Sequence, residues 1–392
     1  MLGSMRTGMR LAISAAAFVS ACAAPPPAET GTAVDAALFD SVTIAPTREA
    51  LTFARIRTGD DHRVLAVQRY EAGQVDAVDL SAALQRDAND PVALFREYGY
   101  ERLQHAIDGA APAARVTVAA ADLVQPLDLR DAHIAAGTNY PEHASDAGVE
   151  NGPFLFPKLV APTPPRAPVD AGDALLDYEV EVAWVTLEPL AKGATPPHMG
   201  VMLCNDYTDR ATLLRHVDPW KPESGDGFAT GKSFDGYLPV GDLFVIPRDF
   251  RSFATGLELR LYVNEAVRQQ SPASLMVWDF DEILAQTWAR QQTTWEHRGT
   301  RVALPGMAEG VIPERTLIMA GTPSGTVFEG VTMAQKLGGV LDWILGGWGR
   351  GVPSHAIERY IGEARSAGIY LRRGDRVVIH VERAGTIRNE VR

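Results

Sequence analysis

The sequence is poor in cysteine and in positive charge. It has two cysteines in 392 residues, and its 37 lysines and arginines are outnumbered by 49 aspartates and glutamates, which gives a net charge of −12. Two cysteines exclude a scaffold built on disulfides. The negative balance argues against non-specific binding of nucleic acid, because a phosphate backbone is bound by clustered lysine and arginine. We therefore expect no nucleic-acid partner.

Several common signatures of enzymes are also missing. The chain has no internal repeat, no glycine-rich dinucleotide-binding fingerprint, and neither a GxSxG nor an HExxH motif. These absences argue against Rossmann dehydrogenases, serine hydrolases with a nucleophile elbow and HExxH metalloproteases. What is present is a globular composition, with 46% hydrophobic and 22% charged residues. The length allows two or three domains, or one large domain with appendages.

Residues 1–21 have the parts of a secretory signal: two arginines, the apolar run LAISAAAFV, and small residues before Cys22. The segment resembles a bacterial lipoprotein leader, which implies cleavage before Cys22, lipidation of Cys22 and export. Ala23 in the next position favours the periplasmic face of the outer membrane. The alternatives are an ordinary signal-peptidase site or a short membrane helix. Residues 22–48 would form a tether.

The rest of the chain predicts an α+β, β-rich fold. Residues 49–127 open with alternating apolar runs and glycine turns, which indicate a small amino-terminal β-rich module. A helix is expected over residues 90–108. Residues 128–392 consist mainly of short strands, with a hairpin at 256–270 and a helix at 281–297.

The stretch LLDYEVEVAWV places Asp177, Glu179 and Glu181 on one face of a strand, about 6.5 to 7 Å apart. Like charges at this spacing repel one another unless water or a cation intervenes. A solvated strand face is the common explanation of such a row. However, Ala183 and Val185 continue the row as apolar residues, which favours a lined cavity. Both alternatives stay open on this stretch alone.

Six further segments accompany this one: GTNYPEHASD, FLFPK, CNDYTDR, GKSFDGYLPVG, YVNEAVRQQ and AGTPSGT. Together the seven resemble the fumarylacetoacetate hydrolase (FAH) family, from residue 128 to the carboxyl end. The resemblance implies an FAH-like mixed β-sandwich roll as the catalytic domain. We also expect a homodimer.

The resemblance implies a divalent-metal site with Glu179, Glu181 and Asp206 as ligands. Hard carboxylate oxygens without clustered cysteine or histidine suit Mg²⁺ or Mn²⁺, with Ca²⁺ as a further candidate. Asp177 has no place in the family motif, and we expect it at the rim of the site.

Three catalytic residues follow from the same resemblance. His143 and Asp146 match a catalytic pair on a short helix, where positions three apart share a face. A carboxylate beside an imidazole fixes its tautomer and supports its work as a base. Asp146 stands where glutamate is commoner. Lys232 would neutralise charge on the substrate oxygen or enolate. His133 lacks such a context and is interpreted as structural.

Four residues are candidates for substrate binding. Thr322, in the turn GTPSG, would offer donors to a substrate carboxylate. Arg210 matches an arginine of the family pattern, although Ala211 replaces the usual aspartate after it. Lys158 and Glu142 are weaker candidates, because either could be a surface charge.

The resemblance implies a hydrolase that cleaves a C–C bond of a 2,4-dioxo acid through a metal-stabilised enolate. A 2-oxo acid decarboxylase or an isomerase or hydratase on the same site is the alternative. A non-catalytic exported binding lipoprotein is the alternative from another class.

Two features remain. Residues 331–368 look inserted relative to the family and are rich in glycine and tryptophan. They could form a lid, a patch facing a membrane or a second subunit, or a peripheral packing helix. Cys204 is expected to pack as a small apolar residue.

Overall fold

The computed structural model describes residues 36–146, 152–332, 334–337 and 351–392. The predicted leader, Cys22 and residues 22–35 of the predicted tether lie outside these residues. The described part of that segment, residues 36–48, packs against the fold, because Phe39 and Val42 are buried and Val42 pairs with Tyr70. In the described part, no helix is long and apolar enough to cross a membrane.

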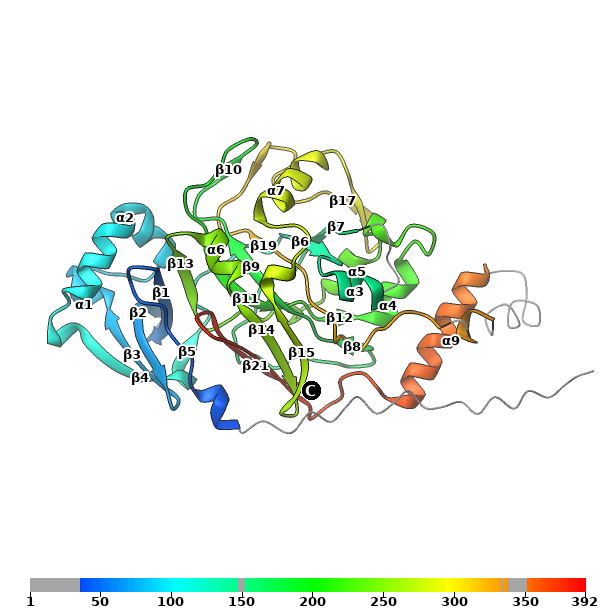
Figure 1. Ribbon diagram of the computed structural model, residues 1–392, viewed down its shortest axis with the longest axis horizontal. Helices are drawn as coiled ribbons and strands as arrows, with labels where there is room; N and C mark the ends of the chain where they lie inside the picture. The colour runs from blue at the N-terminus through cyan, green and yellow to red at the C-terminus, as the bar shows by residue number, and fades with distance from the viewer. Residues whose placement is uncertain (1–35, 147–151, 333, 338–350) are drawn as a thin grey trace, which may run out of the picture.

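One large mixed sheet of eleven strands forms the centre of the described chain (Figure 1). Its strands pair antiparallel, except that β19 runs parallel to β6, and β5 (Leu123–Val124) pairs with β1 off the main path. The order along the path is β4 (Arg115–Ala119), β3 (Gln74–Asp79), β2 (Asp61–Glu71), β1 (Ala50–Thr58), β13 (Phe244–Pro247), β11 (Gly200–Asn205), β9 (Val180–Val185), β19 (Leu317–Met319), β6 (His133–Gly137) and β7 (Phe154–Lys158).

A second sheet of four antiparallel strands lies against the first. Its order is β15 (Ala266–Pro272), β14 (Glu258–Val263), β20 (Arg376–Val381) and β21 (Gly385–Glu390). The predicted hairpin is confirmed as β14 and β15. Its turn residues Asn264 and Glu265 have φ values of 50° and 69°, as a two-residue turn with both central residues left-handed requires. The predicted α+β, β-rich class is thus confirmed.

The amino-terminal strands continue the central sheet. β1 pairs with β13 from Ala50 opposite Pro247 to Phe53 opposite Phe244. This end of the sheet carries α1 (Leu80–Leu84) and α2 (Pro91–Asp108). The helical segment predicted over 90–108 is confirmed, but Gly99, with φ 70° and ψ 172°, interrupts it as a kink between two helical parts. The segment begins where the Asp90 carboxylate accepts a hydrogen bond of 2.9 Å from the N–H of Val92.

The helix predicted over 281–297 is shorter than expected. α7 spans Phe280–Ala289, and Trp295–His297 forms β16, paired with β17 (Thr300–Val302). Two β-branched threonines precede Trp295, and burial of its indole against the core outweighs continuation of the helix.

The remaining elements surround the carboxyl-terminal half. Helix α9 lies at the end of the molecule opposite α1 and α2 and packs against α4 through Leu213, Leu214, Tyr360 and Ile361. The helices are α3 (Pro141–Asp146), α4 (Arg210–His216), α5 (Phe228–Lys232), α6 (Phe250–Thr255) and α9 (Val352–Ala367). Two short antiparallel pairs are β8 (Leu176–Asp177) with β12 (Thr208–Asp209), and β10 (Leu190–Ala191) with β18 (Val311–Ile312).

Candidate active site

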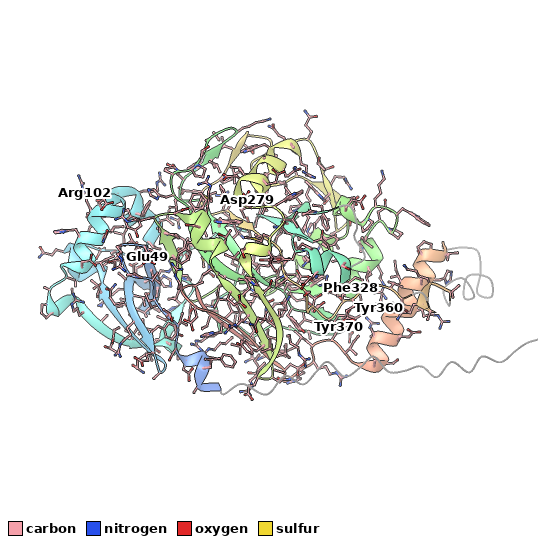
Figure 2. The ribbon with its side chains drawn as sticks, viewed as in Figure 1. Glu49, Arg102, Asp279, Phe328, Tyr360 and Tyr370 are labelled. Carbon is pink, nitrogen blue, oxygen red and sulfur yellow. The ribbon has the colours of Figure 1, made fainter. Side chains whose placement is uncertain are left out.

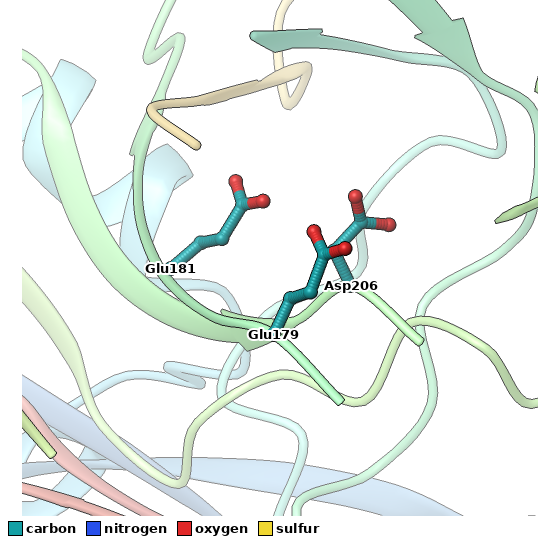
Figure 3. Close-up of side chains that lie close together, drawn as sticks. All are labelled: Glu179, Glu181 and Asp206. Carbon is teal, nitrogen blue, oxygen red and sulfur yellow. The ribbon is translucent and has the colours of Figure 1, made fainter. Parts of the chain in front are cut away.

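Three carboxylates predicted as metal ligands converge at the edge of β9 and β11. The two strands run antiparallel, so that Glu181 lies opposite Cys204. Just beyond β11, the N–H of Asp206 donates to the carbonyl of Glu179 at 3.0 Å, which brings the two side chains together. One carboxylate oxygen of each of Glu179, Glu181 and Asp206 lies within 4.8 Å of the others (Figure 3). Cys204 itself is buried in the core, as expected.

The three carboxylates are buried, and the pKa values of Glu179 and Glu181 are shifted in opposite directions. Burial, followed by the charges of Asp206 and Glu179, raises the pKa of Glu181 well above its usual value. Burial would also raise the pKa of Glu179, but Lys232 and Arg210 outweigh it and hold that pKa at about 2. Glu181 is therefore the member of the cluster that lacks sufficient positive charge nearby.

Two buried lysines neutralise part of the cluster. The ammonium of Lys232 lies 2.7 Å from Glu179 Oε2 and 2.8 Å from Asp206 Oδ2. The ammonium of Lys158 lies 2.6 Å from Asp206 Oδ1 and also donates to backbone carbonyls, including that of Tyr237 at 2.8 Å. Lys158 is therefore no surface charge, and it supplies positive charge to Asp206.

The cluster could hold a divalent metal ion. Glu181 carries a raised pKa because it is buried and because neighbouring carboxylates face it. A dication among the three oxygens would offset that repulsion. Three hard oxygen donors are the ligand chemistry of such ions.

Asp177 was expected at the rim of the site, and this expectation is wrong. Its carboxylate is fully buried and accepts a hydrogen bond from Arg210 Nε at 2.8 Å. The N–H groups of Val327 and Phe328 also donate to it, at 2.9 and 3.2 Å. Arg210 in turn donates from Nη2 to Glu179 Oε1 at 2.6 Å. Asp177 thus holds Arg210 against a predicted metal ligand.

His143 lies on α3 with its imidazole buried, and its Nδ1 has no hydrogen-bond partner among the described residues. Burial lowers the pKa of His143 to about 4, although the charge of Glu179 opposes this shift. Asp146 is exposed, and no hydrogen bond or ion pair joins it to His143 in the described part of the chain. Burial and the charge of Glu142 raise the pKa of Asp146. The expected support of the imidazole by Asp146 is absent, and the carboxylate that acts on His143 is Glu179.

Thr322 is held in place by a residue that sequence reasoning missed. Its hydroxyl donates to the carbonyl of Val180 at 3.0 Å and accepts from Gln269 Nε2 at 2.9 Å. Gln269 Oε1 accepts from the N–H of Val180 at 2.9 Å, so this amide fastens the GTPSG turn to β9. The segment YVNEAVRQQ contains Gln269, but nothing in it singles out a buried amide. Glu142 is exposed and accepts from the Ser324 hydroxyl at 3.3 Å.

A single cavity of about 1080 Å³ unites most of the predicted side chains. Its lining includes His143, Asp146, Glu179, Arg210, Lys232 and Thr322. Helices α4, α5 and α9 form another part of its wall, so α9, from the segment expected to be an insertion, faces the candidate site. The part of that segment over residues 338–350 lies outside the described residues.

Comparison with known proteins agrees with this arrangement. The profile of the fumarylacetoacetate (FAA) hydrolase C-terminal domain matches residues 132–392. The chain belongs to the FAA hydrolase family. The resemblance seen in the sequence is thereby confirmed for the family and for its fold.

Individual FAA hydrolase relatives are distant. Mitochondrial oxaloacetate tautomerase Fahd2a of Rattus norvegicus is 23% identical over 279 residues, which cover 68% of each chain. The structure of fumarylacetoacetate hydrolase from psychrophilic Exiguobacterium antarcticum has a TM-score of 0.53 at 19% identity, covering 87% of this chain and 99% of that chain. Maleylpyruvate hydrolase from Sphingobium sp. SYK-6 has a TM-score of 0.52 at 18% identity, with the same coverage. These similarities show the fold.

Proposed function

We propose that the protein is a divalent-metal-dependent hydrolase that cleaves a carbon–carbon bond of a 2,4-dioxo acid. The observation that carries the proposal is the state of His143. Its imidazole is neutral at pH 7, buried, and has an unbonded Nδ1 in the same cavity as Glu179 and Lys232. A neutral imidazole with a free nitrogen can take a proton from water, which is what hydrolysis needs.

The charges of the site support an anionic substrate. Three cations, Lys158, Arg210 and Lys232, face four buried carboxylates, those of Asp177, Glu179, Glu181 and Asp206. With a dication bound and all four carboxylates ionised, positive charge exceeds negative charge by one. An acid with one carboxylate would complete the balance.

Mg²⁺ or Mn²⁺, with Ca²⁺ as a further candidate, would be held by Glu179, Glu181 and Asp206 and would stabilise negative charge that develops on the substrate oxygens. The protein's own residues would divide the remaining work. Arg210 and Lys232 keep Glu179 ionised, and Lys232 adds positive charge at the cavity wall. Thr322, fixed by Gln269, bounds the cavity at the GTPSG turn.

In the proposed reaction, His143 takes a proton from a water molecule while the oxygen of that water bonds to the 4-oxo carbon of the substrate. The bond between C3 and C4 then breaks, and its electron pair passes to the pyruvate unit as an enolate. A proton is returned to C3. One water is consumed, and the products are pyruvate and a carboxylic acid.

A second candidate is tautomerisation or another isomerisation of a 2-oxo acid. It needs only a proton relay, and the missing contact between His143 and Asp146 favours it. The rat relative is named an oxaloacetate tautomerase. Decarboxylation of a 2-oxo acid is the third reaction that the same site would support.

The test is to incubate the protein with Mg²⁺ or Mn²⁺ and a panel of 2-oxo and 2,4-dioxo acids. Hydrolysis predicts equal amounts of pyruvate and carboxylic acid. Loss of the enol absorbance without formation of pyruvate would show tautomerisation in place of hydrolysis. Release of CO₂ would show decarboxylation in place of hydrolysis. Metal binding without turnover of any acid would instead indicate a binding lipoprotein.

We also propose that the protein is exported and anchored to the outer membrane through lipid on Cys22. The arginines, apolar run and small residues of the leader support this location. Assembly as a homodimer stays a prediction.

A further inference from the structure

The lining of the cavity that contains His143 and Glu179 also includes apolar side chains. Five of them pack in one hydrophobic cluster, and with Ala356 of α9 we call them the apolar arm: Leu213 and Leu214 of α4, Phe228 of α5, Phe328, and Ile357 of α9. A cavity of about 1080 Å³ matches or exceeds the pockets of about 300–1,000 Å³ that take drug-sized ligands. A small 2,4-dioxo acid at the polar end would leave the apolar arm unfilled.

The apolar arm contacts the polar end of the cavity through Phe328. The guanidinium of Arg210 lies 5.6 Å from the centroid of the Phe328 ring, and Phe328 donates its N–H to Asp177. On its other side, Phe328 meets the ring of Tyr360 on α9 edge to face, with centroids 5.6 Å apart. The hydroxyl of Tyr360 shares a hydrogen bond with that of Tyr370. Figure 2 shows Phe328, Tyr360 and Tyr370 together beside α9.

A chain of contacts connects the arm to the polar groups. The contacts run from Glu179 through Arg210 and Asp177 to Phe328 and α9. A single ligand can therefore place a carboxylate at the polar end and an apolar group in the arm, without movement of either wall.

We propose that the substrate is a 2,4-dioxo acid whose acyl group is a medium-length alkyl chain, and that this chain lies in the apolar arm. The proposal rests on the function proposed above and names its substrate class. Apolar side chains from three helices line the arm, and burial of an alkyl chain there removes apolar surface from water. Helix α9, in the segment that looks inserted relative to the family, would thus determine specificity.

The experiment measures kcat/KM for acetyl-, butanoyl-, hexanoyl- and octanoylpyruvate with Mg²⁺ present. Each methylene that enters the arm should raise kcat/KM about fourfold until the arm is filled. If kcat/KM stays constant or falls with chain length while pyruvate is released from every substrate, the proposed alkyl-chain specificity is wrong and the proposed hydrolysis is supported.

Matched variants on α9 locate the effect. Ile357→Asp places a charge in the apolar arm and should lower the octanoyl-to-acetyl ratio of kcat/KM at least tenfold. Ser354→Asp places the same charge on the exposed side of the helix, outside the cavity lining, and should leave that ratio unchanged. Ala356→Phe, which adds volume inside the arm, should shorten the preferred chain if Ile357→Asp does not fold. An unchanged ratio in a folded Ile357→Asp or Ala356→Phe variant would contradict the assignment.

A binding measurement separates this inference from the proposed reaction. Calorimetry with 2-oxodecanoate and pyruvate, neither of which can undergo the cleavage, should give tighter binding of the longer acid to the metal-loaded protein. If no acylpyruvate is cleaved but the longer acid binds more tightly, the proposed reaction is wrong and the proposed binding of an alkyl chain in the apolar arm is supported. Equal affinity for both acids would contradict the proposal that the apolar arm binds an alkyl chain.

Discussion

Lys232 donates a hydrogen bond of 2.7 Å from its ammonium to Oε2 of Glu179, and both side chains are buried. The same ammonium lies 2.8 Å from Asp206 Oδ2, so it occupies the position between two predicted metal ligands. When no metal ion is bound, the positive charge of Lys232 therefore offsets the negative charges of Glu179 and Asp206.

Lys232→Met should therefore destabilise the metal-free protein. It removes one cation from each of two buried carboxylates, Glu179 and Asp206, and leaves them only Arg210 and Lys158 as partners. We expect a loss of about 3 to 5 kcal/mol in the free energy of unfolding. Mg²⁺ should recover part of this loss, because a dication replaces the missing charge. Urea denaturation with chelator and with Mg²⁺ measures both. The exposed Lys192→Met is the control and should change stability by less than about 0.5 kcal/mol.

Metal binding should stabilise the folded state through Glu179, Glu181 and Asp206. At a hundredfold excess of free ion over Kd, the expected gain is about 2.7 kcal/mol. Thermal unfolding should show this increment in the wild type and not in Glu179→Gln or Glu181→Gln.

Asp177→Asn is the informative control for the metal site. Its carboxylate is bonded to Arg210 and does not belong to the triad, so the variant should start less stable yet retain the increment. Equal increments in the wild type and all three variants would mean that the ion binds elsewhere.

His143→Ala should lower the rate by about 10² to 10⁴, if the imidazole takes a proton from water. Metal affinity, measured by calorimetry, should stay near that of the wild type. Asp146→Asn should lower kcat by no more than a few fold, because Asp146 makes no hydrogen bond to His143 in the described structure. A large loss in Asp146→Asn with normal folding would show that the two side chains meet during turnover.

Cys22→Ala should release the protein from the membrane. Acyl chains on Cys22 would hold the mature chain at a bilayer, and the Cys22→Ala variant cannot carry this lipid anchor. Fractionation of cells should find the wild type in the membrane pellet and the variant in a soluble fraction. A wild type recovered wholly in the soluble fraction would contradict the lipoprotein prediction.

Local patterns in the sequence predicted much of this structure. The hairpin at Asn264 and Glu265 and the start of α2 at Asp90 depend on residues adjacent in the chain, and both are confirmed. The family resemblance implied that Glu179, Glu181 and Asp206 converge, and the structure brings them together.

What the sequence did not predict depends on contacts between distant segments. Asp177 is buried because the N–H groups of Val327 and Phe328, about 150 positions away, donate to it. Lys158 was ambiguous because its partner, Asp206, lies in a distant segment just beyond β11. A three-residue spacing placed His143 and Asp146 on one face, but spacing does not fix where a side chain points in a short helix.

His133, interpreted from the sequence as structural, should determine part of the pH dependence of stability. It is fully buried in β6, where its Nδ1 accepts a hydrogen bond of 3.1 Å from the N–H of Leu317. Burial, with a smaller effect of the Lys158 charge, lowers its pKa to about 3. The imidazole is therefore neutral in the folded protein at pH 5.

In the unfolded chain the pKa of His133 returns to about 6.5. Between the two values the unfolded state binds more protons, so the free energy of unfolding falls as the pH falls from about 6.5 toward 3. Above pH 6.5 the His133 imidazole is neutral in the folded and unfolded states, so it does not change the free energy of unfolding with pH. From pH 6.5 to 5 the loss due to this residue should be about 2 kcal/mol. His133→Asn retains an acceptor for Leu317 without a titrating ring, so its urea midpoint should fall less over this interval. Parallel pH profiles for the two proteins would mean that His133 is already protonated in the folded state.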